Sequence, residues 1–432
     1  MIQGSRRRVQ VTRKKLDTLC LEPCALNLVP CQFFIRFTQK SRILSGLKLN
    51  QLFDMSTKGR VLVAMSGGVD SSVAAVMLKE QGYDVIGITM KTWDYHRSGG
   101  DSGKETGCCT VESMNDARHI AVKYGFKHFI VDIRDEFGNW VIDRFVEDYT
   151  SGRTPNPCVL CNTHIKWAAL LRRADNLGCD FIATGHYANV REEGGRYVIS
   201  KGKDHSKDQS YALWGVQQKH LKRTIFPLGK YHKTEIRQLA EDYGLLNVAT
   251  KPDSYEICFI PDNNYHRFLK DKVEDLEERV SGGVFVDKHG KIVGEHKGFP
   301  FYTIGQRRGL ELPMGYPVYV THIDAEKNVI TIGEKEDLIS TTCRAKEMNL
   351  VKYDRVPGGE MEITGKIRYN DDGALGVIKQ LSDEEFEVNF PAGREAITPG
   401  QAIVCYEGDD VVAGGWIHKV NIEINEEVEL EG

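Results

Sequence analysis

The sequence predicts an α/β protein whose first half forms a doubly wound parallel sheet and whose last third forms hairpins that close a small β-barrel or sandwich. In the first half, short apolar runs alternate with segments in which apolar residues recur every three or four positions. Strands that alternate with helices in this way form parallel sheets covered on both faces. After residue 281, alternating segments such as VFVDKHGKIV are separated by turn signals, which is typical of hairpins.

The elements of the first half follow in order along the chain. An apolar strand at 61–64 leads through a glycine-rich turn into a helix at 71–81, which ends at Gly82. The pattern then predicts a strand at 84–90, a helix at 111–124, a strand at 129–132, a helix through 137–149 and a strand at 180–184. One more helix is predicted at 234–243, ahead of the hairpin region.

Length and composition limit the class of protein. A chain of 432 residues is too long for one ordinary core and predicts two or three domains. We expect a soluble, cytoplasmic protein with no membrane segment, because 41% of the residues are hydrophobic, 27% are charged and no run of about 18 apolar residues occurs. The net charge of −4 argues against a generic nucleic-acid coat, so an RNA partner needs local patches of Lys and Arg.

The first 54 residues differ from the rest in charge. They hold ten Lys and Arg against three Asp and Glu, with neither clear periodicity nor a strong helix cap. A targeting peptide is one interpretation of such a start, yet Pro23, Pro30 and charged residues break its apolar stretches. We interpret residues 1–54 as a disordered or non-native extension, with Met55 as the expected start.

The turn after the first strand, Ser66-Gly67-Gly68-Val69-Asp70-Ser71, has the composition of a phosphate-binding loop. Its two glycines let backbone N–H groups converge on an anion, and the helix that follows adds its positive N-terminal end. The serines add hydroxyl donors, and Asp70 is placed to orient Mg²⁺ on the phosphates. A tight turn capped by Ser71 is the structural alternative. No GxxxxGK[ST] occurs, so this is not a Walker-type NTPase.

This hexapeptide resembles the signature of the N-type ATP pyrophosphatases. These enzymes cleave ATP to AMP and pyrophosphate while they adenylate a carbonyl oxygen. The resemblance implies ATP and Mg²⁺ as cofactors, but it leaves the substrate open, since GMP, NAD, asparagine and argininosuccinate synthetases share the loop.

The cysteines favour reactive, redox or metal-binding roles, because eleven occur without the regular spacing of a disulfide scaffold. Cys158 and Cys161 lie at the predicted start of a helix, where a thiol has a depressed pKa. Half of a zinc site, completed by His164, is the alternative, but closed structural zinc takes four ligands and no second CxxC exists. Cys258, taken alone, is expected to be a buried core cysteine, because its neighbours are apolar.

Six motifs together resemble a single family. GRTPNPCVLCN (152–162), ATGHYA (183–188), KDQSYAL (207–213), PLGK (227–230), EICFI (256–260) and TIGQRRGL (303–310) occur in the order found in bacterial tRNA-uridine 2-sulfurtransferases, the 2-thiouridylases. The resemblance spans about residues 58–420. It implies a PP-loop ATP-binding catalytic domain at 55–224, a small central tRNA-contacting domain at 225–280 and a C-terminal β-barrel domain at 281–432 that grips the anticodon arm.

The activity that this resemblance implies is ATP-dependent 2-thiolation of the wobble uridine of tRNAs for Lys, Glu and Gln. The carbon-2 carbonyl is a poor electrophile until transfer of AMP makes its oxygen a leaving group, which sulfur then displaces. Cys258 matches the cysteine that carries the persulfide, and Cys161 matches the nucleophile that frees the sulfur and can close a disulfide with it. A sulfur donor, such as a cysteine desulfurase or a sulfur-relay protein, is implied as a second partner beside tRNA.

The resemblance also assigns binding positions. ATP contacts are implied for Ala64, Met65, Ser66, Gly67, Gly68, Val69, Asp70, Ser71, Met90 and Gly185. Contacts to the target base are implied for Asn156, Pro157 and Cys158. Contacts to the rest of the tRNA are implied for His186, Lys207, Asp208, Gln209, Arg368, Tyr369 and Gln401. Chemistry on a base requires that it be flipped into the pocket.

One position departs from the family pattern, and two other functions stay open. Many relatives carry Asp where this chain has Cys158, and three thiols (Cys158, Cys161 and Cys258) would suit an iron-sulfur cluster that carries sulfide, which we keep as a hypothesis. A PP-loop synthetase or amidotransferase for a small molecule is one alternative, but it would need an ammonia source and no cysteine pair. A non-catalytic RNA-binding iron-sulfur protein is the other, and the intact loop and both transfer cysteines argue against it.

Overall fold

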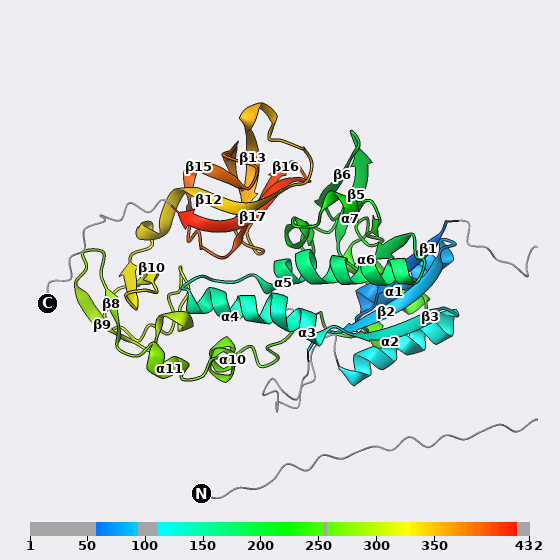
Figure 1. Cartoon of the computed structure of the whole chain (residues 1–432), viewed down its shortest axis with the longest axis horizontal. Helices are drawn as coiled ribbons and strands as arrows, with labels where there is room; N and C mark the ends of the chain where they lie inside the picture. Colours follow the sequence, from blue (N-terminus) through cyan, green and yellow to red (C-terminus); the bar gives the residue numbers. More distant parts are fainter. Residues whose placement is uncertain (1–57, 94–109, 254–256, 421–432) are drawn as a thin grey trace, which may run out of the picture. The chain divides into compact units, whose positions relative to one another are not determined.

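The computed structural model describes residues 58–93, 110–253 and 257–420 (Figure 1). The predicted extension at 1–54 lies outside the described residues. The described residues all belong to one compact unit, Met55–Gly432. Within them, no helix combines the length and the apolar composition needed to cross a bilayer.

A parallel sheet forms the first part of this unit. Its strand order is β3-β2-β1-β4-β7, and every neighbouring pair is parallel. With β1 in the middle and later strands added on both sides, the sheet is doubly wound, which confirms the predicted fold class. The strands are β1 (Arg60–Ala64), β2 (Asp84–Lys91), β3 (Lys127–Asp132), β4 (Phe181–Ala183) and β7 (Thr224–Ile225).

The helices predicted beside these strands are present. α2 (Val111–Tyr124) begins after Thr110, whose hydroxyl accepts a hydrogen bond from the Ser113 N–H, and ends at Gly125 in the left-handed conformation. α1 (Val69–Glu80) begins two residues before the predicted start, because Gly68 is its N-cap. Ser71 therefore lies inside the first turn, where its hydroxyl donates to the Gly68 carbonyl at 3.2 Å, and the structural alternative of a turn capped by Ser71 is not observed.

A mostly helical stretch follows β3. The residues predicted to recur on one face, Phe137, Val141, Phe145 and Tyr149, are all buried. Two π-helical turns, η3 and η4, interrupt the α-helices, and such turns are frequent at functional sites. The elements are α3 (Arg134–Phe137), η3 (Gly138–Ile142), α4 (Asp143–Thr150), α5 (Pro157–Leu160), η4 (Cys161–Lys166) and α6 (Trp167–Asn176).

A hairpin and short helices connect this part to the β region. In α8, Ile236 and Ala240 pack in the same core as Val73 and Val76 of α1. The elements are β5 (Ala188–Glu193), β6 (Arg196–Lys201), η5 (Ser210–Leu213), α7 (Gln218–Leu221), α8 (Lys233–Asp242), α9 (Leu246–Ala249), α10 (Tyr265–Lys272) and α11 (Leu276–Arg279).

The hairpin predicted over VFVDKHGKIV is present, and a second hairpin follows it. β8 (Gly283–Val286) pairs with β9 (Ile292–His296), and β10 (Tyr319–Asp324) pairs with β11 (Val329–Gly333), each antiparallel. β11 also pairs in parallel with β8, which joins the two hairpins into one sheet of order β10-β11-β8-β9.

The last part of the chain is a closed β-barrel. Its strand order is β12-β15-β14-β13-β16-β17, and β17 pairs back with β12 to close it, which resolves the open choice between barrel and sandwich. The β5–β6 hairpin extends this sheet through the pair Asp410 and Ser200. The strands are β12 (Ile339–Leu350), β13 (Glu360–Lys366), β14 (Ala374–Gln380), β15 (Glu385–Glu395), β16 (Ala402–Glu407) and β17 (Asp410–Val420), with the short helices η6 (Phe299–Phe301), η7 (Glu336–Leu338) and η8 (Pro357–Gly359) before and between them.

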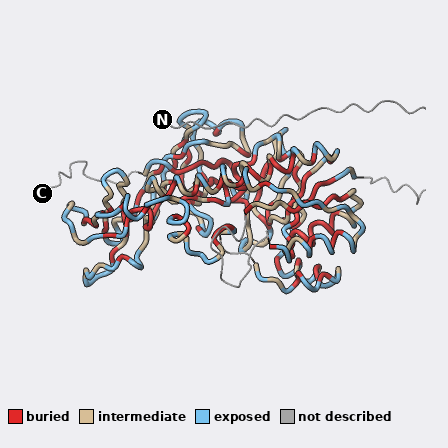
Figure 2. Tube along the Cα trace, turned by 60° about the horizontal axis from the view of Figure 1, so that its bottom comes forward, coloured by how far each residue is buried: buried red, intermediate tan, exposed pale blue. Residues whose placement is uncertain are grey.

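The buried residues run through the interior of the unit, while the outer turns are exposed (Figure 2). One cluster is continuous from α4 and α6 to the barrel strands β16 and β17, through contacts that include Trp214 against Trp416 at 5.6 Å. The helical stretch that carries Cys158 and Cys161 is thus packed into a core shared with the barrel.

Candidate active site

The loop between β1 and α1 curls around the first turn of the helix. The Ser66 N–H donates to the Ser71 hydroxyl at 3.0 Å, and the Ser72 hydroxyl donates to the Gly68 carbonyl at 2.8 Å. No side chain caps the N-terminus of α1. Its first N–H groups and its positive end are therefore directed to the loop, as an anion site requires.

Two glycines make the space that this loop needs. Gly67 has a φ of 75°, and a Cβ there would lie 2.1 Å from the Ser113 carbonyl oxygen of α2. A Cβ at Gly185, just after β4, would lie 2.8 Å from the Ser71 nitrogen and 2.9 Å from the Asp70 carbonyl carbon. Ala64 and Met90, at the carboxyl ends of β1 and β2, are half-buried against the core. The positions implied for ATP thus lie around one sheet edge, and the glycines and uncapped helix suit a nucleotide phosphate.

Asp70 is held by two side chains that the sequence did not point to. The Lys233 ammonium donates to both Asp70 carboxylate oxygens, at 2.8 and 2.7 Å, and the Tyr187 hydroxyl donates to one of them at 2.7 Å. Burial, and then the charge of Asp70, raises the pKa of Tyr187, so its hydroxyl stays a donor. Tyr187 belongs to the ATGHYA motif, whereas Lys233 lies 163 residues from Asp70 and no local pattern marks it.

The GRTPNPCVLCN segment forms a capped helix start with one accessible and one buried thiol. The Asn156 side chain accepts a hydrogen bond from the Val159 N–H at 3.3 Å, and Pro157 occupies the first turn of α5. Cys158 is exposed, whereas Cys161, one turn later, is buried in the core. Asn162 anchors the following π-helical turn by donating to the Ala212 carbonyl at 2.9 Å.

The expected depression of the Cys158 pKa is wrong. Although the residue is exposed, the protein atoms around its thiol desolvate it, and this desolvation raises the pKa. The positive charge of Lys166 lowers the pKa by a smaller amount. Cys158 is therefore a protonated thiol at neutral pH, which disfavours nucleophilic attack by it.

Alkylation measures this directly. We expect the rate at which iodoacetamide labels Cys158 to rise about tenfold per pH unit from pH 7 to pH 9, because the thiolate fraction still grows over that range. Peptide mapping by mass spectrometry separates Cys158 from the remaining cysteines, including Cys258, which is the second exposed thiol among the described residues. A plateau reached near pH 7 would contradict the raised pKa.

Cys258 is exposed, contrary to the expectation from its apolar neighbours. Phe259 takes the buried position instead, with its ring 5.2 Å from that of Phe145 and 5.8 Å from that of Phe137. This anchors the chain immediately after Cys258 to α3 and α4 and leaves Cys258 itself exposed. Ser254, Tyr255 and Glu256 lie outside the described residues.

The described cysteines form no disulfide, so the predicted bond between Cys161 and Cys258 is not present in this structure. Within residues 58–93, 110–253 and 257–420, no three His, Cys, Asp or Glu side chains lie close enough together to hold a metal ion. Cys158, Cys161 and Cys258 are thus not gathered as iron-sulfur ligands, and His164 does not complete a zinc site with the CxxC pair.

Two of the residues implied for tRNA contact, Tyr369 and Asp208, are hydrogen-bonded to each other. The Tyr369 hydroxyl donates to the Asp208 carbonyl at 3.0 Å, and burial, then the charges of Asp208 and Cys158, raise the pKa of Tyr369. Asp208 shapes its own loop by accepting from the Gly202 and Ser210 N–H groups. Gln209 accepts from the Tyr187 N–H at 3.0 Å. Arg368 is exposed.

A turn of the barrel docks on the segment that precedes Cys158. The Gln401 amide donates to the Thr154 and Pro155 carbonyls at 3.1 and 2.9 Å, and the Thr154 N–H donates to the Pro399 carbonyl at 2.9 Å. Gly400 has a φ of 92°, and a Cβ there would lie 2.8 Å from the Thr154 oxygen. In this structure Gln401 fixes the thiol segment to the barrel, which is a role that the resemblance did not imply.

His186 is a neutral imidazole in this structure. Burial, and then the charge of Lys166, lowers its pKa well below the ordinary value. Its Nδ1 shares a hydrogen bond of 2.7 Å with the Thr184 hydroxyl, and its ring lies 5.8 Å from that of Trp167. At this position it can hydrogen-bond a nucleotide but adds no charge for phosphate.

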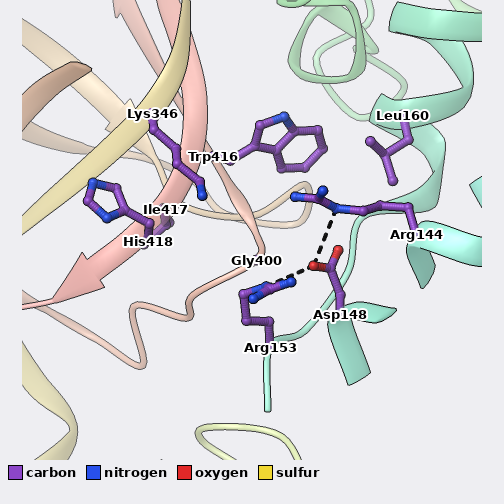
Figure 3. A pocket seen from close by; sticks show the side chains of 9 residues that line it. All are labelled: Arg144, Asp148, Arg153, Leu160, Lys346, Gly400, Trp416, Ile417 and His418. Carbon is purple, nitrogen blue, oxygen red and sulfur yellow. Dashed lines mark hydrogen bonds and ion pairs between the residues drawn. The ribbon is translucent and has the colours of Figure 1, made fainter. Parts of the chain in front are cut away.

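A basic pocket of about 270 Å³ lies between α4 and the barrel (Figure 3). Arg144 and Arg153 reach the buried Asp148 at 3.5 and 2.8 Å from one side, while Lys346 and the indole of Trp416 come from the barrel strands opposite. Gly400 belongs to the lining, so the pocket adjoins the turn that docks on the thiol segment. Three cationic side chains against one buried carboxylate leave the pocket with net positive charge.

Three family models match successive parts of the chain. A tRNA methyl transferase HUP domain matches residues 59–262, a tRNA methyl transferase PRC-barrel domain matches 267–334, and an aminomethyltransferase beta-barrel domain matches 340–417. The tRNA-specific 2-thiouridylase MnmA of Salinibacter ruber is 64% identical over 377 residues, which cover 87% of this chain and 98% of that protein. The chain belongs to the MnmA family.

A second MnmA protein, from Cytophaga hutchinsonii, is 59% identical over 363 residues, which cover 84% of this chain and 98% of that protein. Membership in the MnmA family confirms the resemblance drawn from the six motifs. Among solved structures, a 4-thiouridine synthetase in complex with RNA and bound ATP matches 50% of this chain and 51% of its own at 18% identity with a TM-score of 0.33, too low to add to the argument.

Proposed function

We propose that this chain is an ATP-dependent sulfurtransferase that replaces the carbon-2 oxygen of a tRNA uridine by sulfur. The observation that carries the proposal is that the chain spans 98% of a relative named tRNA-specific 2-thiouridylase at 64% identity. The intact phosphate loop and both transfer cysteines support the same chemistry.

The loop at 66–71 is proposed to bind ATP for the adenylation of the uridine. ATP would lie against the N–H groups of Gly67 and Gly68 and the start of α1, with Mg²⁺ on Asp70. ATP supplies the AMP group: the carbon-2 oxygen of uridine attacks the α-phosphorus, and pyrophosphate leaves. Donors that are fixed before the reaction stabilise the negative charge that develops on the leaving pyrophosphate.

Cys258 and Cys161 are proposed to carry out the sulfur transfer to the adenylated uridine. The donor leaves a persulfide, Cys258–S–SH, at the exposed thiol, and its terminal sulfur attacks carbon 2 and expels AMP. Cys161 then attacks the Cys258 sulfur, which breaks the S–S bond to the transferred sulfur and forms a Cys161–Cys258 disulfide. An external thiol must reduce that disulfide before the next turnover. Because Cys161 is buried and forms no disulfide with Cys258 in this structure, the proposal requires this bond to form during each turnover.

The target base is proposed to bind beside Asn156, Pro157 and Cys158, with Tyr369 next to it. A flipped uridine finds there an accessible protonated thiol, a phenol and a segment fixed by Gln401. The arrangement offers hydrogen bonds without a full charge, which suits a neutral base. Lys207 and Arg368 supply cations for the flanking phosphates.

The basic pocket between α4 and the barrel extends this surface. Lys346→Glu is expected to weaken tRNA binding about tenfold and to lower the slope of log Kd against log salt concentration by about 1, because one phosphate contact is lost. Lys79→Glu is the matched control, since Lys79 lies in the last turn of α1, at the sheet edge away from the loop. Equal weakening by both variants would show a general charge effect and contradict a specific contact.

The finer parts of the proposal follow the family resemblance. The substrates would be the wobble uridines of tRNAs for Lys, Glu and Gln, met in the cytoplasm, and the sulfur would come from a cysteine desulfurase or a sulfur-relay protein. The domain division at 55–224, 225–280 and 281–432 stays a prediction. An iron-sulfur route through Cys158 would require side chains that this structure keeps apart to come together, so the persulfide route is the one we propose.

Nucleoside mass spectrometry tests the proposal. tRNA incubated with the protein, Mg²⁺, ATP and a cysteine desulfurase with cysteine is expected to contain 2-thiouridine, and omission of ATP is expected to remove it. The same spectrum separates an oxygen-to-sulfur exchange from an added methyl group, the change that the names of two matching domain families suggest. Absence of thiolated nucleoside from every tRNA tested would overturn the proposal.

A further inference from the structure

A chain of alternating charges runs from Asp70 of the phosphate loop to a second half-buried carboxylate, that of Asp253. The Lys233 ammonium, 10% exposed, lies 2.7 and 2.8 Å from the two Asp70 oxygens and 2.9 Å from an Asp253 oxygen. A lysine this buried between two carboxylates has little freedom to point elsewhere. Its position is therefore set by both partners.

Asp253 is the centre of this network. Beside Lys233 it accepts from the Lys207 ammonium at 2.7 Å and from the Arg237 guanidinium at 2.9 Å. Arg237 also donates to the Lys251 carbonyl at 3.1 Å, which fixes the main chain just before Asp253. Burial acts to raise the pKa of Asp253, but the hydrogen bonds from Lys207 and Lys233 outweigh it and hold the pKa well below the usual range, so the carboxylate stays charged.

The scaffold under Lys233 is rigid. Lys233 is the first residue of α8, whose N-terminus is closed by a capping box between His232 and Glu235, and the Lys233 N–H donates to the Asp204 carboxylate at 2.9 Å. α8 in turn packs on α1, the helix that begins with the phosphate loop. Side-chain contacts between residues far apart in the sequence thus connect the phosphate loop, α8 and the segment at 249–253.

We propose that Lys233 and Asp253 are positioning residues of the nucleotide step: Lys233 holds the Asp70 carboxylate in place for cation-bound phosphates, and Asp253 holds Lys233. The inference rests on the proposed use of ATP. A divalent cation on Asp70 must share that carboxylate with the Lys233 ammonium, and the two cations repel each other. Asp253 supplies the second anion that keeps Lys233 at its place when this happens.

Because Asp253 acts on Asp70 through Lys233, we predict that substitutions of Lys233 and Asp253 have non-additive effects on nucleotide affinity. We expect Lys233→Met and Asp253→Asn each to weaken binding of a non-hydrolysable ATP analogue with Mg²⁺ about tenfold, because each loses a charge-assisted hydrogen bond in the series. The double variant is expected to be no weaker than the weaker single variant, because Asp253 acts through Lys233. Isothermal titration calorimetry gives the dissociation constants, and differential scanning calorimetry gives the melting temperatures.

Controls separate positioning from mere stability. Asp262→Asn removes a carboxylate on the other side of Cys258, which pairs with Arg267 at 2.7 Å, and should leave the analogue affinity unchanged. Lys233→Met is expected to change the dissociation constant for tRNA by no more than about twofold, although it weakens binding of the analogue. A general loss of structure would weaken both. If Asp253→Asn does not fold, Asp253→Glu, which keeps the charge, is expected to bind the analogue within about threefold of the native chain.

The outcomes are distinct. Additive weakening in the double variant, native affinity in Lys233→Met, or an Asp253→Glu protein that folds but binds as poorly as Lys233→Met would overturn the inference. If the native chain binds the ATP analogue and the series holds, but no tRNA is thiolated, the proposed function fails and the inference stands.

Discussion

Cys258→Ser is expected to lower the rate of 2-thiouridine formation by about 10³-fold or more, while tRNA-dependent release of pyrophosphate from ATP continues. Serine cannot carry a persulfide, so no sulfur reaches the adenylated base. The nucleotide loop is untouched, because Cys258 is an exposed side chain and the core position next to it belongs to Phe259. The two rates therefore separate in this variant.

Mass spectrometry of digested tRNA measures the first rate, and a coupled pyrophosphate assay measures the second. Cys179→Ala is the control, since Cys179 is a buried thiol just before β4, at the sheet edge opposite the loop, and should leave both rates near native. Normal thiolation by Cys258→Ser would show that another group carries the sulfur.

Asp70→Asn is expected to reduce tRNA-dependent pyrophosphate release by about 10²- to 10³-fold. The amide is a poor ligand for Mg²⁺. The substitution also removes one of the two carboxylates that pair with the mostly buried Lys233 ammonium. The Tyr187 hydroxyl also loses its charged acceptor. Thiolation should fall by the same factor, because the base must be adenylated before sulfur can attack.

Asp84→Asn is the matched control for this change. Asp84 begins β2 and pairs with Arg60 at 2.6 Å, with both side chains 44% exposed, and such surface pairs contribute about 0–1 kcal/mol. We expect its kinetics to be native. Pyrophosphate release by Asp70→Asn at the native rate would show that Asp70 does not serve the nucleotide.

The parallel sheet could be predicted because its signals are local. β1, the glycine turn and α1 are adjacent in sequence, and the match of α2 to 111–124 follows from Thr110 and Gly125 at its ends. The addition of the β5–β6 hairpin to the barrel could not be predicted, since it depends on Arg191 binding Asp410, 219 residues away, at 2.8 Å. Apolar periodicity carries no information about such pairs.

The candidate site, too, could be predicted only where its signals are local in sequence. The phosphate loop and the CxxC segment are contiguous motifs, whereas the contacts of Asp70 with Tyr187 and Lys233 join residues 117 and 163 positions apart. The exposure of Cys258 was missed because its apolar neighbours suggested burial, although Phe259 and Ile260 enter the core without it. The raised pKa of Cys158 was missed because desolvation depends on the tertiary surroundings and not on the helix start.

A single turnover with isotopically labelled sulfur loaded on Cys258 tests the central claim most directly. With tRNA and ATP, the label is expected to leave the protein and appear at carbon 2 of a uridine, with one pyrophosphate released for each sulfur transferred. Label that reaches tRNA equally well without ATP, or that stays on Cys258 while the tRNA becomes thiolated from another source, would contradict the account.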